Sequence, residues 1–195
     1  MARPLSDDKR TAILEAATEV VAMLGVSAPT AKIAKGAGVA EGTLFTYYAN
    51  KDELLNRLYQ ELKTDLRDAI MADYPSGGSL IDRSRHFWYR YIGWGSAHPL
   101  KRRAMRQLAV SDRITEETKK LAGDASGKVN DMMRGWAAGG AMRRQPPSFV
   151  SAIMSAIADT TMDFIAREPA QAKRYTRAGF EAFWKAVAGC FFFSE

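Results

Sequence analysis

Apolar residues recur along this chain at the three- and four-residue spacing that places them on one face of a helix. The first such stripe consists of Ile13, Ala16, Ala17, Val20, Val21 and Leu24. Gly25 follows it at the position where a left-handed residue commonly ends a helix. The same spacing predicts two short helices near 29–37 and 41–48, then a longer one that opens at Asn50.

Proline and glycine divide the rest of the chain into further helical stretches. A cluster of breakers covers 75–79, a His-Pro pair stands at 98–99, and Pro169 separates the last two stretches. Between them the pattern predicts helices over about 80–97, 100–110, 112–138, 147–167 and 170–190. No segment shows the period-two alternation of β-branched residues that is typical of strands, so the sequence predicts an all-α protein.

The composition excludes several classes of protein. The 195 residues include one cysteine, Cys190, which leaves no intramolecular disulfide and no multi-cysteine metal site. His86 and His98 lack partners at ligand spacing, so we expect neither a metal nor a cofactor. No apolar run is long enough to cross a bilayer, and no signal-peptide stretch opens the sequence, which predicts a cytoplasmic protein with no membrane partner.

Net charge gives little guidance about partners. Lys and Arg number 28 against 22 Asp and Glu, a formal net charge of +6. Residues 1–63 carry eight basic and eight acidic side chains, so the surplus lies in the remainder of the chain. The densest basic cluster is Lys101, Arg102, Arg103 and Arg106, which fits a solvated helix face, a phosphate contact or a counter-charge for an acidic ligand. A prediction of DNA binding must therefore rest on a motif.

The segment 10–50 has the layout of a helix-turn-helix. The turn is Lys35-Gly36-Ala37-Gly38-Val39-Ala40, with small residues where two short helices cross. The helix after it would lie in the major groove of DNA, where Gly42 lets the backbone approach closely. Its leading end would present Glu41, Thr43, Thr46 and Tyr47. An ordinary helical hairpin is the alternative interpretation of the same residues.

Two longer strings favour the groove-binding interpretation. They are Ile13-Leu14-x-Ala16-Ala17 and Ile33-Ala34-x-x-Ala37-Gly38-Val39-x-x-Gly42-Thr43-Leu44-Phe45-x-Tyr47-Tyr48-x-x-Lys51-x-x-Leu54. Together they resemble the N-terminal DNA-binding region of TetR-family regulators over residues 12–55. The resemblance implies a three-helix helix-turn-helix domain at 1–50, followed by a larger helical ligand-binding and dimerisation domain at 51–195. It also implies a homodimer on a palindromic operator of double-stranded DNA.

The resemblance assigns DNA contacts by matched position. The expected residues are Thr30, Glu41, Gly42, Thr43, Thr46, Tyr47, Tyr48 and Lys51. Those at 41–47 would face base edges or nearby phosphates, Tyr48 would combine packing with a backbone contact, and the Lys51 ammonium would contact phosphate. Core packing is the alternative for Leu44, Phe45 and part of Tyr48.

Two positions depart from the family's pattern. Ala28-Pro29 stands where hydroxyl residues are usual, which leaves Thr30 or Ser27 to supply a helix cap and a phosphate contact. Phe45 stands where Tyr is frequent, so a phenolic contact to phosphate is absent. Both departures affect individual contacts and leave the predicted fold unchanged.

Large flexible and aromatic side chains mark a candidate effector region. They are Phe87, Trp88, Tyr91 and Trp94 within 80–97, joined by Met105, Leu108, Met132 and Trp136 from later helices. Plain hydrophobic core is one interpretation of this set. The family resemblance favours the other, a predominantly apolar pocket for a hydrophobic or aromatic small-molecule effector.

The last two predicted helices carry the candidate dimer interface. Their apolar stripes are Phe149, Ile153, Ile157 and Phe164, then Phe180, Phe183, Trp184 and Val187. Small residues on the first stripe permit close helix approach, and the family resemblance implies a four-helix bundle with a second copy. Internal packing within one chain is the alternative.

The family resemblance implies a ligand-responsive DNA-binding transcriptional regulator, with repression as the expected sign. Effector binding would favour a dimer whose two recognition helices no longer match successive grooves. No Ser/His/Asp set, Cys/His pair, phosphate-binding loop or metal spacing indicates an enzyme. The alternative is a helical interaction protein that has lost operator binding, which the neutral balance of residues 1–63 favours.

Overall fold

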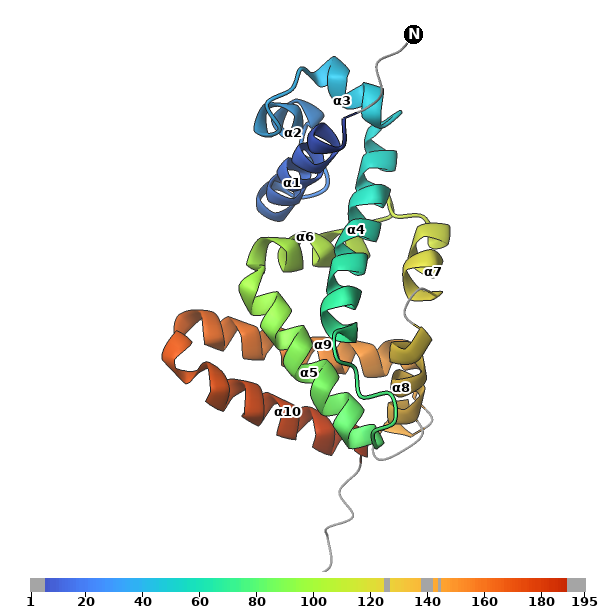
Figure 1. Cartoon of the computed structure of the whole chain (residues 1–195), viewed down its shortest axis with the longest axis vertical. Coiled ribbons are helices and arrows are strands. Elements are labelled where there is room, and N and C mark those ends of the chain that lie inside the picture. The colour runs from blue at the N-terminus through green and yellow to red at the C-terminus, as the bar shows by residue number, and fades with distance from the viewer. Residues whose placement is uncertain (1–5, 125–126, 138–141, 144, 189–195) are drawn as a thin grey trace, which may run out of the picture. The chain divides into compact units, whose positions relative to one another are not determined.

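The computed structural model of the protein describes residues 6–124, 127–137, 142–143 and 145–188. Within these ranges the regular structure consists of helices without a strand, which confirms the all-α prediction (Figure 1). In chain order the helices are α1 (Asp7–Leu24), α2 (Thr30–Gly36), α3 (Glu41–Tyr47), α4 (Lys51–Met71), α5 (Leu80–Ala97), α6 (Pro99–Ala109), α7 (Glu116–Asp124), α8 (Gly127–Ala137), α9 (Pro147–Arg167), the 3-10 turn η2 (Pro169–Gln171) and α10 (Ala172–Ala188).

The chain forms two compact units, each assembled from separate stretches. One comprises Met1–Asp65 with His98–Asp124, and the other Leu66–Ala97 with Ala125–Glu195. The packing units do not follow the expected boundary between a DNA-binding domain at 1–50 and a ligand-binding domain at 51–195. That functional boundary remains a prediction. Helix α4 is continuous across residue 65, and α6 packs on α1 within the first unit.

In the first unit, α1 is held between α2 and α6. Its buried face includes Ile13, Ala17 and Val21, as the stripe predicts, but Leu24 at the end of the stripe is half exposed. The Gln107 side-chain amide on α6 donates a hydrogen bond of 3.2 Å to the Ala22 carbonyl. This contact between helices explains why a segment near residue 100 belongs with the N-terminal one.

Two glycines adopt the left-handed backbone that the turns of this unit require. Gly25 ends α1 with φ of 85°, and its N–H donates to the Val21 carbonyl. Gly38 has φ of 65° in the turn between α2 and α3. Other residues are strained in this region of φ, so these positions fix where the helices end.

The second unit is built around an aromatic core. Trp88 on α5, Trp136 on α8 and Phe183 on α10 are almost completely buried. The Trp88 ring stacks on Phe183 with 5.5 Å between centroids, and Trp136 meets Phe183 edge-on at 4.8 Å. These offset and perpendicular geometries are the favourable ones for aromatic pairs.

Helix α10 passes very close to its neighbours at one point. A Cβ atom added to Gly179 would lie 2.3 Å from Thr161 Oγ1 and 2.7 Å from Trp88 Cζ2. Both distances are well inside van der Waals contact, so the absence of a side chain at Gly179 permits the crossing of α10 with α9 and α5.

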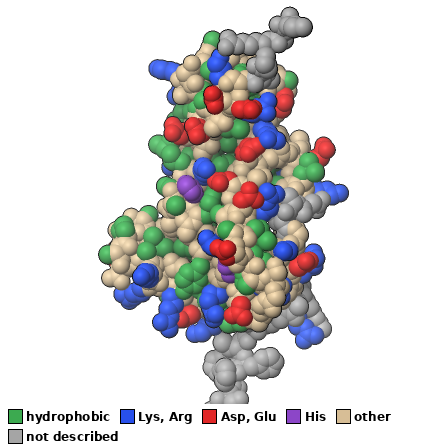
Figure 2. Space-filling view, viewed as in Figure 1, with side chains coloured by type: hydrophobic (Ala, Val, Ile, Leu, Met, Phe, Trp, Pro, Cys, Tyr) green, Lys and Arg blue, Asp and Glu red, His purple; other side chains and the backbone are tan. Residues whose placement is uncertain are grey.

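The surface of the described residues mixes charges, with basic side chains gathered along α10 (Figure 2). One segment, Ser148–Arg167, is long and apolar enough to cross a membrane by length and composition, with a mean hydropathy of 1.4. Helix α9 packs with α5, α8 and α10 in the second unit, a place where helices of such composition are common. Its composition is therefore weak support for a membrane span.

Candidate functional site

Helices α2 and α3 and the turn between them form a compact helical corner in the first unit. The Val39 N–H donates to the Ala34 carbonyl at 3.0 Å, which closes the turn around Gly38. Leu44 is the fully buried anchor of α3, as the core alternative for it predicts. A helix of seven residues with one buried anchor presents most of its side chains outward.

The outward surface of α3 is short, polar and open. Glu41, Gly42 and Thr46 are exposed, and Thr43 and Tyr47 are half-buried. A Cβ built on Gly42 would find no atom within 4 Å, so the backbone there is accessible. The Thr46 hydroxyl donates to the Gly42 carbonyl at 3.1 Å. This surface gathers most of the side chains that the sequence predicts to contact DNA.

Phe45 lies on the surface, whereas the core interpretation predicts that it is buried. Its side chain is 41% exposed, whereas the adjacent Leu44 is buried. Consecutive residues of a helix point about 100° apart, so one anchor on the inner face leaves its neighbour on the surface. Phe45 therefore joins the candidate DNA-facing surface as an apolar group.

Thr30 does not cap α2 in the way that the sequence suggests. Its hydroxyl instead donates to Glu41 Oε1 at 2.6 Å and links the first residues of α2 and α3. The N-cap residue of α2 is Pro29, which forms no side-chain cap. Thr30 thus fixes the relative position of the two helix starts, and its contact with DNA stays a prediction.

Lys51 begins α4 and holds the loop before α2. Its ammonium donates a hydrogen bond of 2.7 Å to the Ala28 carbonyl. Burial, and then the positive charge of Arg113, lower the pKa of this ammonium below its usual value. The remaining N–H donors of the ammonium are consistent with the expected phosphate contact.

Tyr47 and Tyr48 are adjacent in sequence but have different surroundings. The Tyr47 hydroxyl accepts a hydrogen bond of 3.0 Å from the Ser6 N–H. Tyr48 is 4% exposed, and its hydroxyl is buried without a hydrogen-bond partner in the described structure. Its ring supplies the packing that the sequence predicts. Its hydroxyl does not face solvent in the described structure, so the expected contact with the DNA backbone stays a prediction.

The predicted effector residues are all buried, and they belong to two different packing units. Phe87, Trp88, Tyr91 and Trp94 on α5 belong to the second unit together with Met132 and Trp136 on α8, whereas Met105 and Leu108 on α6 belong to the first. Helix periodicity reveals a buried face without revealing which helix covers it, so the effector role of all eight residues stays a prediction.

The two central indoles are satisfied inside the second unit. Trp88 Nε1 donates to the Thr176 carbonyl at 2.9 Å, and Trp136 Nε1 donates to Ser84 Oγ at 2.8 Å. With both N–H groups paired and both rings covered, these residues act as core in the described conformation, which is the core interpretation of the aromatic segment.

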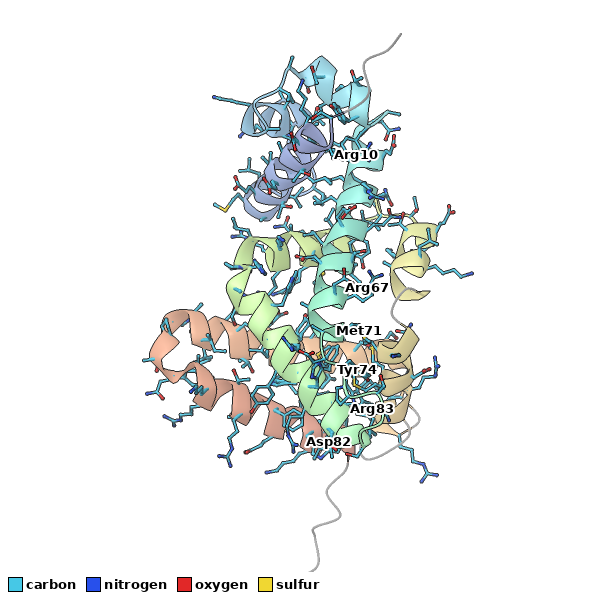
Figure 3. The ribbon with its side chains drawn as sticks, in the orientation of Figure 1. Arg10, Arg67, Met71, Tyr74, Asp82 and Arg83 are labelled. Atoms are coloured by element: carbon cyan, nitrogen blue, oxygen red, sulfur yellow. The ribbon has the colours of Figure 1, made fainter. Side chains whose placement is uncertain are left out.

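A polar cluster beside this core was not predicted. The Tyr74 ring meets the His86 ring edge-on at 5.7 Å, and His86 Nε2 lies 2.9 Å from the Ile70 carbonyl. Burial raises the pKa of the Tyr74 phenol, and the Arg83 guanidinium beside it opposes that shift (Figure 3). Arg83 Nε is buried without a partner among the described residues. Tyr74 stands in the loop after α4, outside any periodic pattern that could have indicated it.

The predicted dimer residues divide between surface and core. Phe149 and Phe164 on α9 are exposed, and Ile153, Ile157 and Trp184 are half-buried. Phe180, Phe183 and Val187 on α10 are buried within their own chain, and their expected contact with a second copy stays a prediction. Their stripe is the inward face of α10. Residue spacing alone does not distinguish a face that packs inside its own chain from a face that contacts a second copy.

An apolar groove of about 460 Å³ lies between α9 and α10. It is lined by Ala156, Ile157, Thr160, Thr161, Phe164, Tyr175, Ala178 and Gly179. The half-buried and exposed members of the α9 stripe, Ile157 and Phe164, line it directly. The structure thus brings part of the predicted interface to a concave apolar surface.

The sequence matches known regulators most strongly at its N-terminal end. Residues 13–58 match the family described as bacterial regulatory proteins, tetR family. The fatty acid metabolism regulator protein of Bacillus subtilis (strain 168) is 44% identical over 81 residues, a match that covers 38% of this chain and 42% of that protein. The chain therefore matches less than half the length of this curated relative.

Solved structures extend the likeness over the whole fold. A putative tetR family transcription regulator from Shewanella sp. PV-4 superimposes with a TM-score of 0.79 at 28% identity, covering 93% of this chain and 99% of that one.

Two more distant structures contain ligands and share the fold. FadR from Bacillus subtilis in complex with stearoyl-CoA matches at 16% identity, and LfrR from Mycobacterium smegmatis in complex with proflavine at 18%, each with a TM-score of 0.65. The match covers 93% of this chain and 99% of FadR, and 94% of this chain and 99% of LfrR.

Proposed function

The chain is a member of the TetR family of bacterial regulatory proteins, and from this premise we propose that it is a ligand-responsive transcriptional repressor. The observation that carries the proposal is the surface of α3, where a buried Leu44 anchors a helix whose other side is open and polar. Such a helix after a tight turn is suited to enter a major groove. Repression is the simplest consequence of a protein bound over an operator.

We propose that α3 reads bases through Thr43, Thr46 and Tyr47. Short hydroxyl side chains reach base edges when the backbone is close, and the open space at Gly42 allows that approach. Phe45 adds an exposed apolar group that suits contact with a thymine methyl or sugar. Lys51 supplies a phosphate contact that fixes the position of the helix.

The protein acts as a homodimer in this proposal, with the second copy on the α9–α10 groove. Exposed Phe164 and half-buried Ile157 are large apolar groups that water would otherwise cover. Two copies related by a two-fold axis place two α3 helices against a palindromic operator. Phe164→Arg is expected to yield a folded monomer, and a dimer of unchanged stability in light scattering would contradict this interface.

The proposed effector has a large apolar or planar aromatic part. Relatives of the same fold are described with stearoyl-CoA and with proflavine, which share that character. The second unit offers aromatic and methionine side chains on α5 and α8, and the Tyr74–Arg83 pair beside them suits a polar end of such a molecule. The buried rings would have to part to admit it, and that rearrangement would be the switch.

A mobility-shift assay tests the function directly. The wild type is expected to shift the DNA upstream of its own coding sequence more strongly than random DNA, with binding that weakens as salt increases. Stearoyl-CoA and proflavine serve as the first effector probes, and one of them should release the operator and quench tryptophan emission at similar concentrations. Equal weak binding to every DNA would favour the alternative, an interaction protein, for which the eight basic and eight acidic side chains of residues 1–63 argue.

A further inference from the structure

The first unit contains a second polar site, at the end of α3 and next to its outward surface. A cavity of about 380 Å³ is lined by Arg10, Tyr47, Tyr48, Glu53, Asn56, Arg57 and Gln60. These residues come from α1, from the end of α3 and from the first turns of α4. Figure 3 shows Arg10 on α1 beside the start of α4, which forms the opposite wall. All seven lining side chains carry hydrogen-bonding groups.

The Tyr48 hydroxyl is an unsatisfied donor at this cavity. The residue is 4% exposed, and the hydroxyl oxygen is buried with no hydrogen-bond partner in the described structure. Burial raises the pKa of the phenol, and the charges that act on it most after burial are those of Arg10 and Arg57. The hydroxyl is therefore neutral near pH 7, keeps its proton and needs an acceptor.

The basic side chains of the cavity are better placed for an anion than its acidic ones. Arg10 forms no ion pair with any described residue, whereas Arg57 is paired with Glu61. The single lining carboxylate, Glu53, accepts the Ala49 N–H at 2.7 Å, while its own N–H donates to Asn50 Oδ1. These hydrogen bonds place the negative charge of Glu53 at the positive end of α4, which partly compensates that charge.

We propose that this cavity binds a phosphate group, held by the guanidinium groups of Arg10 and Arg57 and by a hydrogen bond that the Tyr48 hydroxyl donates. Phosphate offers several acceptor oxygens, and the planar fork of a guanidinium group binds such oxygens with two parallel hydrogen bonds. Because the Tyr48 hydroxyl is buried in the described structure, side chains that line the cavity would have to move to admit the anion to it.

The phosphate has two possible sources, the DNA backbone or a free phosphorylated molecule. Tyr47, a wall of the cavity, also belongs to α3, so a backbone phosphate in the cavity would lie at the edge of the proposed reading surface. Only this DNA source rests on the proposed function. Binding of free phosphate does not depend on any operator.

Titration of the full-length protein with inorganic phosphate at constant ionic strength tests the site, with amide shifts at residues 47–57 as the readout. Tyr48→Phe and Arg10→Gln should each weaken phosphate binding by about tenfold. Two matched controls should bind as the wild type does. Tyr59→Phe removes the hydroxyl of a buried tyrosine of α4 that does not line the cavity, and Lys9→Gln removes the charge next to Arg10.

The thermal stability of Tyr48→Phe separates the proposal from a merely structural role. Loss of an unsatisfied buried donor should leave the melting temperature unchanged or raised, so weaker phosphate binding would not reflect unfolding. Equal phosphate affinity in Tyr48→Phe, Arg10→Gln and both controls would overturn the proposal. If Tyr48→Phe fails to fold, Arg10→Gln against Lys9→Gln decides alone.

Neutral methylphosphonate groups, placed one at a time along the operator, identify the source. If a backbone phosphate enters the cavity, one substitution should abolish the difference in affinity between the wild type and Tyr48→Phe. If no position does so, but free phosphate still binds, the source is a small molecule. Phosphate binding without any operator binding would refute the proposed function and leave the cavity site standing.

Discussion

Helices α3 and α10 each contain phenylalanine and glycine, but these residues are exposed on α3 and tightly packed on α10. Phe45 on α3 is 41% exposed, while Phe183 on α10 is completely buried. Gly42 on α3 has open space where a side chain would be, while a Cβ on Gly179 of α10 would overlap Thr161 and Trp88. The difference shows that neither an aromatic residue nor a glycine has a fixed meaning along this chain.

The number of packing partners accounts for the difference. Helix α3 has seven residues and packs mainly on α2, so one inward residue, Leu44, suffices to hold it. Helix α10 has 17 residues and packs on α5, α8 and α9. A helix covered from several sides has little surface left for recognition, whereas a helix held at one point keeps most of its surface available.

The largest expected effect on the free energy of unfolding comes from replacing the phenylalanine of each helix with arginine. Phe183→Arg should prevent folding, since it removes a buried ring worth about 3–5 kcal/mol and adds an unpaired charge to the core. Phe45→Arg should change the free energy of unfolding by less than about 0.5 kcal/mol. Urea unfolding followed by circular dichroism measures both. A folded Phe183→Arg protein would contradict the conclusion that α10 tolerates no charge where α3 does.

The two glycines sharpen the same contrast. Gly179→Ala should lower the free energy of unfolding by about 1–3 kcal/mol through steric overlap with Thr161 and Trp88. Gly42→Ala should raise it by up to about 1 kcal/mol, because alanine favours helix and meets no atom. The same substitution at Gly42 should weaken operator binding. Destabilisation by both alanines in thermal melts would contradict the difference in packing.

DNA affinity distinguishes the roles proposed within the first unit. Thr46→Ala and Tyr47→Ala should each cost about 1–3 kcal/mol on the operator and change base preference. Lys51→Ala should weaken binding to operator and random DNA alike and flatten the salt dependence. Mobility shifts over a salt series measure these effects. Equal losses on both DNAs for all three variants would refute the division between base and phosphate contacts.

The smallest effect concerns the link between the starts of α2 and α3. Thr30→Val removes the hydrogen bond to Glu41 and should lower the free energy of unfolding by about 0.5–1.5 kcal/mol. Thr30→Ser keeps the hydroxyl and serves as the control in thermal unfolding. If Thr30→Val weakens DNA binding without any loss of stability, Thr30 acts as a DNA contact and the link is incidental.

Much of the first unit was predictable from the sequence. The glycines at 25 and 38 mark turns because their backbone conformation is a local property. The open surface of α3 was predictable as well, since a short helix with few apolar positions has one obvious inner face. The link between Thr30 and Glu41 was not, because hydrogen bonds between side chains of different helices leave no periodic signal.

Less of the second unit followed from sequence, although its residues were correctly recognised as apolar. The sequence by itself determined which positions are apolar and which of them share one face of a helix, as Phe180 and Phe183 do on α10 and Phe164 does with its neighbours on α9. Only the tertiary structure decided that the first two are covered by their own chain while Phe164 lines an open groove. Periodicity records the direction of a side chain around its own helix axis, whereas burial depends on which other helices arrive there. The same reason placed Met105 in one unit and Trp136 in the other.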